Sequence, residues 1–414
     1  MTSSSDAGRV RKEVLRALTK GPLPRKRLME RVRGNRGLVS KTVNELRDEG
    51  LIEPTDRGFA LTPEGLKALV EPERRFEYRD ERIELSREGE NLEEFLRVIK
   101  GESKSRTGSI VVTTRCDMRC KFCYYNLVKE HVDLEPEETL EEAERRVRAG
   151  NREIVLQGAS PHLLDGDLVE AVSMIKEELS VDVAVGTGPT IPVDLLEDLK
   201  LAGLDYVKFS LSGRTPEEWK AVTGRRKGFE ELWEAVAWCL ANGLEVSFVG
   251  GVVGLPGIPP EADAERVAAI KDLNPGKSVI QFNPAQDPVK GPFSGPGVLR
   301  TVYEGVRRRV KGEVFLKSCC VTPASMTVFE ALGGLVDKVV CMLGRECREY
   351  HGCPFTGRVL EQKILNVLHS SGSPLSVREL ARRTGIGRAK LSKRLRSLER
   401  RGVVERTEEG WRLR

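Results

Sequence analysis

Short β-branched runs alternate with charged, helix-periodic segments through the middle of the chain, and this alternation limits the possible folds most strongly. The β-branched runs lie at 109–114, 153–156, 181–185, 206–211, 245–249 and 278–282, and the helix-periodic segments lie at 139–149, 168–178, 193–201, 216–240, 260–273 and 297–310. Six β–α units predict an α/β fold with a parallel sheet wrapped by helices, either a partial (β/α)6 barrel or a doubly wound sheet. Functional residues of such folds lie at the carboxyl ends of the strands.

A cysteine motif with the spacing C-x3-C-x2-C follows the first of these runs directly. Thiolates are the ligands of iron–sulfur clusters. Three thiolates on one loop can hold three irons of a cube and leave the fourth iron open, and an open position marks a catalytic centre. The motif consists of Cys116, Cys120 and Cys123, with the aromatic residue Phe122 before the last cysteine.

The surroundings of the motif suggest how it would bind metal. A structural zinc site is the alternative to a cluster, and His131 is the only nearby candidate for a fourth ligand. Basic neighbours are expected to favour the thiolate form and to offset the negative charge of a cluster. These neighbours are Arg115, Arg119 and Lys121.

With the strand before it and the β–α units after it, the motif resembles that of the radical S-adenosylmethionine (SAM) superfamily over residues 105–310. The resemblance implies a partial (β/α)6 barrel, a [4Fe–4S] cluster on the three cysteines, SAM as cosubstrate and an electron donor as partner. It implies reductive cleavage of SAM to a 5′-deoxyadenosyl radical that abstracts hydrogen from a substrate. The chemistry belongs to the cofactor, so no side chain of this chain is assigned as catalytic.

The resemblance also implies contacts to SAM at the ends of later strands. The family's Gly-Gly-Glu segment corresponds to residues 157–159, where the Glu is missing and the backbone is left to bind the amino group. Polar residues at the end of the fourth strand, an arginine for the carboxylate and a glycine pair beside the adenine complete the site. The implied cofactor-binding residues are Phe122, Gly158, Ala159, Ser210, Ser212, Arg225, Gly250 and Gly251.

A second group of cysteines follows the last β–α unit. Four thiolates could close a second iron–sulfur cluster, three could leave an iron free for substrate, and a structural zinc site is the alternative. Adjacent side chains cannot easily both face one metal, so the choice between Cys319 and Cys320 stays open. The expected ligands are Cys320, Cys341, Cys347 and Cys353, with His351 as a substitute for a thiol.

The two ends of the chain repeat each other at an offset of 352 residues. Each copy reads as three helices followed by two short strands around a turn, which resembles the winged helix-turn-helix family. In that family the third helix enters the DNA major groove. In the second copy this helix offers Arg388, Lys390, Lys393, Arg394, Arg396 and Arg400; in the first it offers Arg36 and Lys41, with Asp48 and Glu49 at its end.

Net charge also differs between the two ends of the chain and its middle. Residues 1–70 carry a net charge of +6 and residues 357–414 one of +9, whereas the whole chain carries only +5. Basic ends favour an anionic partner, and the second copy is the better candidate for nucleic acid. A solvated basic face without a specific partner, or a winged helix that grips a peptide, is the alternative.

These patterns predict four domains: a winged helix at 1–75, a radical SAM core at 100–312, a cysteine-rich extension at 313–356 and a second winged helix at 357–414. No secretory signal or membrane span is expected, so the chain is predicted to be cytoplasmic. Two functions remain open: a radical SAM enzyme acting on a peptide, a nucleic acid or a small molecule, and an iron–sulfur sensing transcription regulator. The substrate and the oligomeric state cannot be inferred from the residues.

Overall fold

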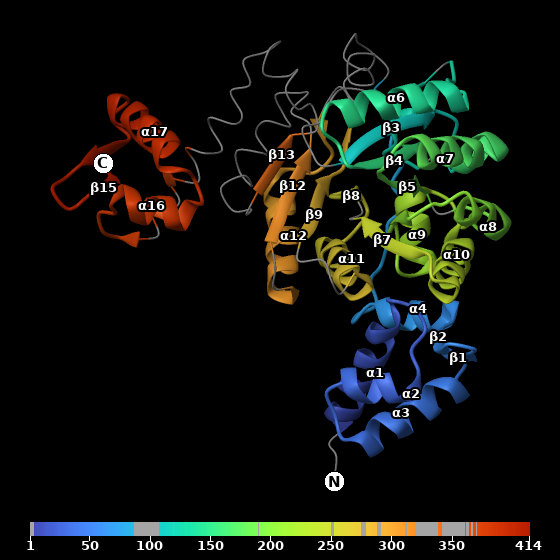
Figure 1. Cartoon of the computed structure of the whole chain (residues 1–414). Coiled ribbons are helices and arrows are strands. Elements are labelled where there is room, and N and C mark those ends of the chain that lie inside the picture. Colours follow the sequence, from blue (N-terminus) through green and yellow to red (C-terminus); the bar gives the residue numbers. More distant parts are fainter. Residues whose placement is uncertain are drawn as a thin grey trace.

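The computed structural model describes most of the chain (Figure 1). It describes residues 4–86, 107–118, 120–128, 130–188, 190–249, 252–274, 279–287, 291–310, 313–318, 338–341 and 361–414 without 362, 363, 366 and 370. For residues 4, 5, 279–282, 313–318 and 338–341 only the backbone is described. No helix in these ranges is both long and apolar enough to cross a membrane.

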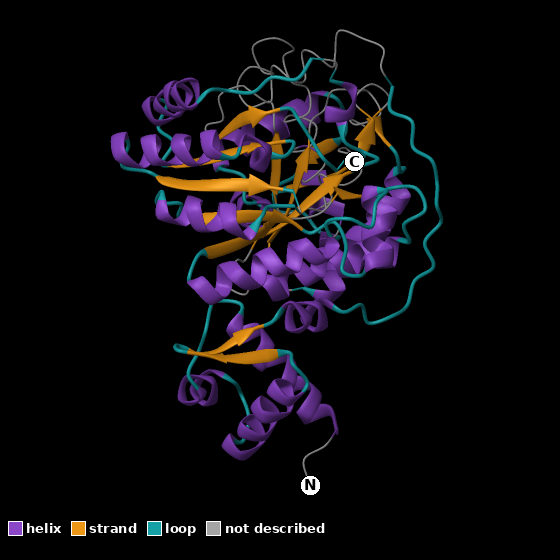
Figure 2. Cartoon of the chain, turned by 90° about the vertical axis from the view of Figure 1, so that its right-hand side faces the viewer, coloured by secondary structure: helices purple, strands orange, loops and turns teal. Residues whose placement is uncertain are grey.

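Five parallel strands form the main sheet, in the same order as in the sequence. They are β3 (Thr107–Thr113), β4 (Glu153–Gly158), β5 (Asp182–Thr187), β6 (Tyr206–Ser210) and β7 (Glu245–Val249). The connecting helices are α6 (Pro136–Arg148), α7 (Gly166–Glu178), α8 (Val193–Leu201), α9 (Pro216–Thr223) and α10 (Phe229–Asn242). They lie along the outside of the strands (Figure 2). A doubly wound sheet would reverse its strand order at a switch point, and this sheet does not.

A second parallel sheet continues the series. It contains β8 (Val252–Val253), β9 (Val279–Pro284), β12 (Glu313–Ser318) and β13 (Lys338–Cys341), with α11 (Pro260–Leu273) and α12 (Pro296–Arg309) packed together beside it. A small antiparallel pair, β10 (Gln286–Asp287) and β11 (Gly291–Pro292), follows β9. The predicted α/β fold with parallel strands is confirmed, and β12 and β13 are strands that the sequence pattern does not reveal.

The central strands are buried on both faces. In β4, Ile154, Val155 and Leu156 are each at most 1% exposed, and in β5 the run 183–185 is fully buried. Consecutive residues of a strand point to opposite faces, so burial of a whole run requires helices on one face and barrel interior on the other. This is why these strands read as continuous apolar runs rather than as alternating ones.

Both ends of the chain fold as helix-turn-helix modules with a two-stranded wing. The first contains α1 (Ser4–Leu18), α2 (Arg25–Arg31), α3 (Arg36–Asp48), β1 (Ile52–Thr55), β2 (Gly58–Leu61) and α4 (Pro63–Val70). The second contains α16 (Val377–Thr384), α17 (Arg388–Arg400), β14 (Val404–Arg406) and β15 (Trp411–Leu413).

The structure reproduces the repeat at its offset of 352 residues. Leu23 forms an isolated β-bridge with Phe59, and the corresponding residues Leu375 and Trp411 form the same bridge. Gly58 approaches the backbone of residue 23 so closely that a Cβ there would lie 2.3 Å from the carbonyl carbon, and the matching glycine of the second copy approaches residue 375 in the same way. Two copies that share a bridge and a close approach confirm the winged-helix resemblance of both ends.

The first module is attached to the barrel. Helix α4 packs against α10 and α11, and its apolar residues belong to the same hydrophobic core as the main sheet. Lys67 pairs with Glu230, and Lys12 of α1 lies 3.2 Å from Asp272. The chain then continues along the barrel, where the backbone N–H of Arg79 donates to the carbonyl oxygen of Gly257. This segment leads from the winged helix to the site described next.

Candidate active site

The cysteine loop lies at the carboxyl edge of the main sheet, directly after β3. It is closed by hydrogen bonds that do not involve thiols: the carbonyl oxygen of Cys120 accepts from Cys123 N at 3.0 Å and from Asn126 Nδ2 at 2.8 Å. A 3-10 turn at Tyr124–Leu127 ends the loop. Cys116, Cys120 and Cys123 are free cysteines, each partly exposed. The loop is therefore shaped before any metal binds.

The donor set fits an iron–sulfur cluster better than a single metal ion. Within the described residues, no three His, Cys, Asp or Glu side chains converge closely enough to hold one ion. His131 faces elsewhere, because its Nδ1 lies 3.2 Å from the carbonyl oxygen of Thr114. A cubane spaces its thiolates around its corners, and three free thiols on one loop match that requirement. Cys116 Sγ is also approached by Met118 N at 3.3 Å, the type of hydrogen bond that tunes a cluster sulfur.

For two of the three thiols the pKa is raised, not lowered as basic neighbours alone would make it. Burial raises the pKa of the Cys120 thiol, and it raises the pKa of Cys123 to about 12. Two of the basic neighbours form ion pairs with carboxylates: Arg115 Nε lies 2.8 Å from Asp133 Oδ2, and Lys121 Nζ lies 3.1 Å from Asp80 Oδ1. Arg119 lies outside the described residues. Deprotonation of thiols with a raised pKa is expected to accompany metal binding, because the thiolate is the ligand.

Asp117, inside the loop, is held by three donors that we call the Asp117 clamp: Ser160, His162 and Thr190. Ser160 Oγ and Thr190 Oγ1 donate at 2.8 and 2.9 Å, and His162 Nε2 lies 3.5 Å away. Burial alone would raise the pKa of Asp117, but these hydrogen bonds hold that pKa well below its usual range. The clamp joins the cysteine loop to the chain after β4 and after β5, which stay at fixed positions because they follow neighbouring strands.

Phe122 lies on the other side of the loop, in a small apolar cluster. It packs against the same buried apolar residues as Phe76, Tyr78 and Ile83, which belong to the segment that comes from the first winged helix. Lys121 reaches the same segment through Asp80 and through the carbonyl oxygen of residue 81 at 3.2 Å. In this structure Phe122 and that segment thus share one buried cluster, and contact of Phe122 with SAM remains a prediction.

The residues predicted to bind SAM lie at the ends of neighbouring strands. Gly158 ends β4, and the backbone N–H of Ala159 donates to Thr113 O at 3.1 Å. An ammonium group only donates hydrogen bonds, so any contact of Ala159 with it would use a carbonyl oxygen. Ser210 ends β6 and Ser212 follows it, buried to 9% exposure. The positions of these four residues are compatible with contacts to SAM, and the contacts themselves remain predictions.

Arg225 lies against the cysteine loop. Its Nη1 donates to the carbonyl oxygen of Asp117 at 2.8 Å, and its own N–H is accepted by Thr223 Oγ1. The structure thus places the side chain beside the motif, as a carboxylate-binding role requires, and pairing with the carboxylate of SAM remains a prediction.

Several predicted ligands lie outside the described residues. They are Gly250, Gly251, Cys319, Cys320, Cys347, Cys353 and His351. Cys341 is described only as the last residue of β13, whose backbone pairs with Ser318 of β12. The second metal site therefore remains a prediction.

Two features of the site escape the sequence reasoning. The Asp117 clamp joins residues 43 to 73 positions apart, which no local pattern reveals. Thr187, at the end of β5, is 3% exposed, and its Oγ1 has no hydrogen-bond partner among the described residues. A buried hydroxyl without a partner at the carboxyl edge of a parallel sheet is a candidate ligand contact. A polar residue shortly after a predicted strand is the signal that could have identified it, since Thr187 follows the run 181–185 by two positions.

Replacing Asp117 with alanine should loosen the cysteine loop. The variant leaves three donors without their acceptor, and hydrogen bonds to a charged group contribute about 1.5–3 kcal/mol each. We expect a loss of about 2 kcal/mol in unfolding free energy and a lower iron content after reconstitution, measured by thermal denaturation and iron analysis. Glu170→Ala, at an exposed position of α7, is the control. Equal iron content and stability in both variants would contradict the role of the clamp.

Two family descriptions match the chain. Residues 110–273 match the Radical SAM superfamily, and residues 363–410 match the MarR family. The first match begins in β3 and ends with α11, so it contains the cysteine loop and the strand ends described above. The second match covers most of the C-terminal winged helix.

Curated relatives share this central region. A probable GTP 3′,8-cyclase of Methanocaldococcus jannaschii is 26% identical over 191 residues, which cover 45% of this chain and 62% of the relative. The GTP 3′,8-cyclase of Syntrophomonas wolfei is 33% identical over 132 residues, 31% of this chain and 40% of the relative. The chain thus spans less than two thirds of the length of these relatives.

Solved structures show a more distant likeness. The crystal structure of methylornithine synthase is 16% identical, covers 62% of this chain and 75% of its own, and superposes with a TM-score of 0.40. No assignment rests on it. The family match, the parallel α/β fold and the cysteine loop at the end of β3 agree with one another, and we conclude that residues 110–273 of this chain form a domain of the radical SAM superfamily.

Proposed function

We propose that the chain is a radical SAM enzyme that binds a [4Fe–4S] cluster through Cys116, Cys120 and Cys123 and cleaves SAM reductively. The observation that carries the proposal is the loop with three free thiols at the carboxyl edge of the parallel sheet, within the region that matches the superfamily. When bound, the cluster supplies one electron to the sulfonium of SAM, and cleavage of the C5′–S bond gives methionine and a 5′-deoxyadenosyl radical.

The side chains have binding and positioning roles in this proposal. The Asp117 clamp keeps the three thiols in register with the ends of β4 and β5. Carbonyl oxygens after Gly158 would accept from the amino group of SAM, and the serines at the end of β6 would bind its polar groups. The radical can abstract a hydrogen atom only if one C–H bond of the substrate is held close to it. The other strand ends of the barrel must hold the substrate in that position.

The substrate stays at the level of a class: a peptide, a nucleic acid or a small molecule. The curated relatives act as GTP 3′,8-cyclases by name, but their similarity to this chain is confined to 31–45% of it. Basic modules at both ends favour a macromolecular or anionic substrate.

The test is reconstitution of the full chain with iron and sulfide under anaerobic conditions, reduction with dithionite and analysis for 5′-deoxyadenosine. We expect product that depends on SAM and on the reductant. A fully loaded, reduced protein that forms none would contradict the enzyme and favour the alternative, an iron–sulfur sensing regulator that needs no SAM cleavage.

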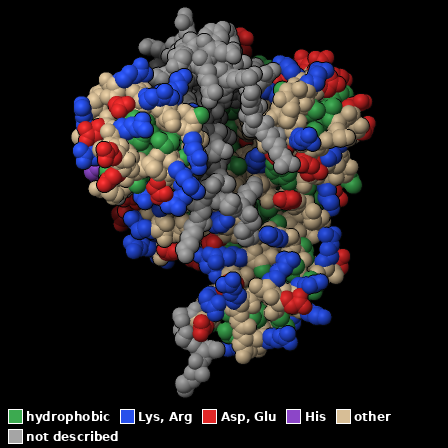
Figure 3. Space-filling model, turned by 60° about the vertical axis from the view of Figure 1, so that its left-hand side comes forward, with side chains coloured by type: hydrophobic (Ala, Val, Ile, Leu, Met, Phe, Trp, Pro, Cys, Tyr) green, Lys and Arg blue, Asp and Glu red, His purple; other side chains and the backbone are tan. Residues whose placement is uncertain are grey.

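A second proposal concerns the C-terminal winged helix, which we propose binds nucleic acid through α17. Lys and Arg side chains spread over this module (Figure 3). Among the described residues, Lys390, Lys393 and Arg396 are exposed and have no carboxylate partner. Arg394, which the sequence places on the same face, pairs with Glu361 at 3.4 Å and is less available.

The N-terminal copy has a different environment. On α3, Lys41 pairs with Glu45 at 3.5 Å and Arg47 with Asp48 at 2.7 Å. Its wing strand β2 packs against α10 of the barrel. A winged helix commonly contacts DNA with both the third helix and the wing, so these contacts favour a structural or peptide-binding role for this copy.

Lys393→Glu should therefore weaken binding to random duplex DNA, and Lys41→Glu, at the matching position of the first copy, should not. Loss of a phosphate contact lowers the slope of log K against log salt by about one. Binding measured by fluorescence anisotropy over a series of salt concentrations gives this slope. Equal binding by the wild type and the Lys393 variant would remove α17 as the contact, and binding of a peptide instead of DNA would reassign the module.

A further inference from the structure

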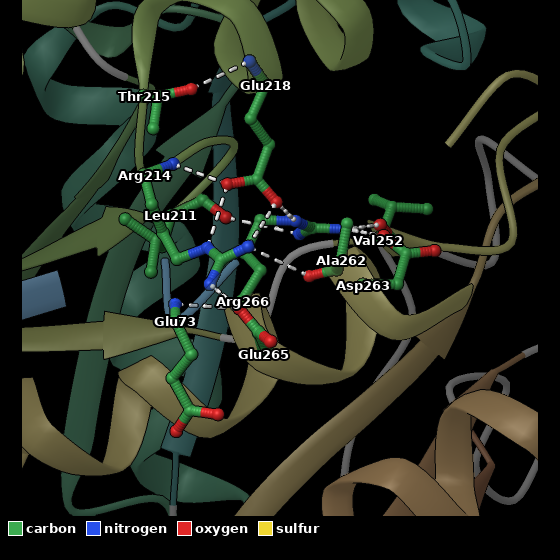
Figure 4. A network of polar contacts seen from close by, with 10 residues as sticks. All are labelled: Glu73, Leu211, Arg214, Thr215, Glu218, Val252, Ala262, Asp263, Glu265 and Arg266. Carbon is green, nitrogen blue, oxygen red and sulfur yellow. Dashed lines mark hydrogen bonds and ion pairs between the residues drawn. The ribbon is translucent and has the colours of Figure 1, made fainter. Parts of the chain in front are cut away.

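Five charged side chains are buried together behind the ends of β6 and β8, and we call them the buried charge cluster (Figure 4). Each is at most 4% exposed. Burying charges carries a large desolvation cost, and apolar residues of similar volume often serve stability as well or better. The cluster therefore calls for a reason other than stability. Its members are Arg214, Glu218, Asp263, Glu265 and Arg266.

Arg266 of α11 joins two strand ends. Its Nη1 donates to the carbonyl oxygen of Leu211 at 3.3 Å, and its Nη2 donates to that of Val252 at 2.7 Å. Leu211 directly follows β6 in the main sheet, and Val252 begins β8 in the second sheet. A guanidinium is a planar fork with fixed donor directions, so one side chain sets the position of both backbones relative to each other.

The carboxylates of the cluster fix the arginine and the same two loops. Asp263 pairs with Arg266 and accepts the backbone N–H of Gly254, just after β8, at 2.7 Å. Glu218 lies 3.5 Å from Arg266 Nε and accepts the backbone N–H of Arg214 at 2.8 Å. Both loops are thus held twice, by a donor on α11 and by a carboxylate.

The loops that the cluster holds are those with the predicted SAM contacts. Ser210 and Ser212 flank Leu211, and the glycine pair 250–251 directly precedes Val252 in the sequence. The side chain of Arg266 is fully buried and its guanidinium is engaged by the protein itself, so its effect on a ligand must be exerted through these backbones.

We propose that Arg266, held by Glu218 and Asp263, is a positioning residue that fixes the end of β6 against the start of β8 and so sets the two walls between which SAM binds. This inference rests on the proposed function. It assigns to the cluster a role in affinity for the cosubstrate rather than in holding the iron, because the cysteine loop is fixed by separate contacts.

The experiment uses the full chain with Arg266→Met, reconstituted anaerobically. Electron paramagnetic resonance of the reduced protein, recorded while SAM is added, reports binding at the cluster, and 5′-deoxyadenosine formation gives KM and kcat. We expect wild-type iron content and a wild-type spectrum without SAM. The SAM concentration for the half-maximal spectral change should rise about tenfold or more, by analogy with the loss of groups that orient metal ligands.

Arg146→Met is the matched control. Arg146 of α6 is 3% exposed and pairs with Glu142 at 2.6 Å, and it packs near Gly108 at the opposite, amino-terminal end of β3. The same substitution at this site should lower the melting temperature but leave the SAM requirement unchanged. If Arg266→Met does not fold, Arg266→Lys, which keeps the charge without the fork, should give the same shift in SAM requirement.

An Arg266 variant that melts earlier, as the control does, but needs no more SAM than the wild type would overturn the inference. Failure of the proposed function would give a different experimental result. In that case the loaded wild-type protein itself would show neither a spectral response to SAM nor 5′-deoxyadenosine, and the inference would fall with it.

Discussion

Replacing Cys120 with alanine should abolish formation of 5′-deoxyadenosine while leaving the fold intact. The thiol is one of three expected cluster ligands, and a cluster held by two thiolates of the loop is not expected to keep the geometry that leaves one iron open. The backbone of the loop does not depend on this thiol, because the carbonyl oxygen of Cys120 accepts from Cys123 N and Asn126 Nδ2. Iron analysis, product analysis and circular dichroism together separate loss of cluster from loss of fold.

Cys239→Ala is the control for this experiment. Cys239 is fully buried in α10, away from the motif, and belongs to the hydrophobic core. Its replacement removes a sulfur from the core and should cost about 1 kcal/mol of stability without loss of iron. If the Cys120 variant keeps a full cluster and its activity, the loop is not the site of SAM cleavage.

The strands of the barrel could be predicted from the sequence because of how they are buried. Each central strand has helices on one face and barrel interior on the other, so it reads as an uninterrupted apolar run such as 183–185. Runs of this kind, separated by helix-periodic segments, identify parallel strands. Strand β12 was missed because its apolar run, 314–316, is shorter than the four to eight residues that identify a buried strand.

The position of the cysteine loop could also be predicted, since a loop that follows a parallel strand must lie at its carboxyl end. The contacts that hold the loop could not. Asp117 contacts Ser160 and Thr190 because the strands that precede these residues are neighbours in the sheet. The order of strands in a sheet cannot be read from the sequence, so these contacts could not be predicted. The partners of the basic neighbours could not be predicted for a related reason: Arg115 and Lys121 are close to the cysteines in sequence, but their partners Asp133 and Asp80 are distant.

The buried charge cluster, too, could be predicted only in part from residues that are close in sequence. The spacings of Arg214 with Glu218 and of Asp263 with Arg266 are visible as helical or near-helical pairs. In a sequence such pairs usually indicate an exposed helix face. Only the packing of α11 against the sheets shows that these charges are buried and that they hold two strand ends.

Replacing Gly158 with alanine should lower the stability of the fold and should also disturb the site. A Cβ at this position would lie 2.2 Å from the carbonyl oxygen of Thr113 and 3.2 Å from its nitrogen. Both are backbone atoms of β3, so no side-chain rotation relieves the contact, and the ends of β3 and β4 must separate. Overpacking of this kind costs about 1–3 kcal/mol, occasionally more.

The consequences of that separation reach the cysteine loop, which begins one residue after Thr113. The hydrogen bond from Ala159 N to Thr113 O would be stretched, and Ser160, which holds Asp117, would move with β4. We therefore expect the Gly158 variant to lose iron as well as stability, measured by iron analysis and thermal denaturation. In Gly166→Ala, at the start of α7, an added Cβ meets no atom within 4 Å, and both quantities should stay at the wild-type level. Wild-type iron content in the Gly158 variant would mean that the loop does not depend on the close approach of β3 and β4, and that the cysteines alone set the geometry of the site.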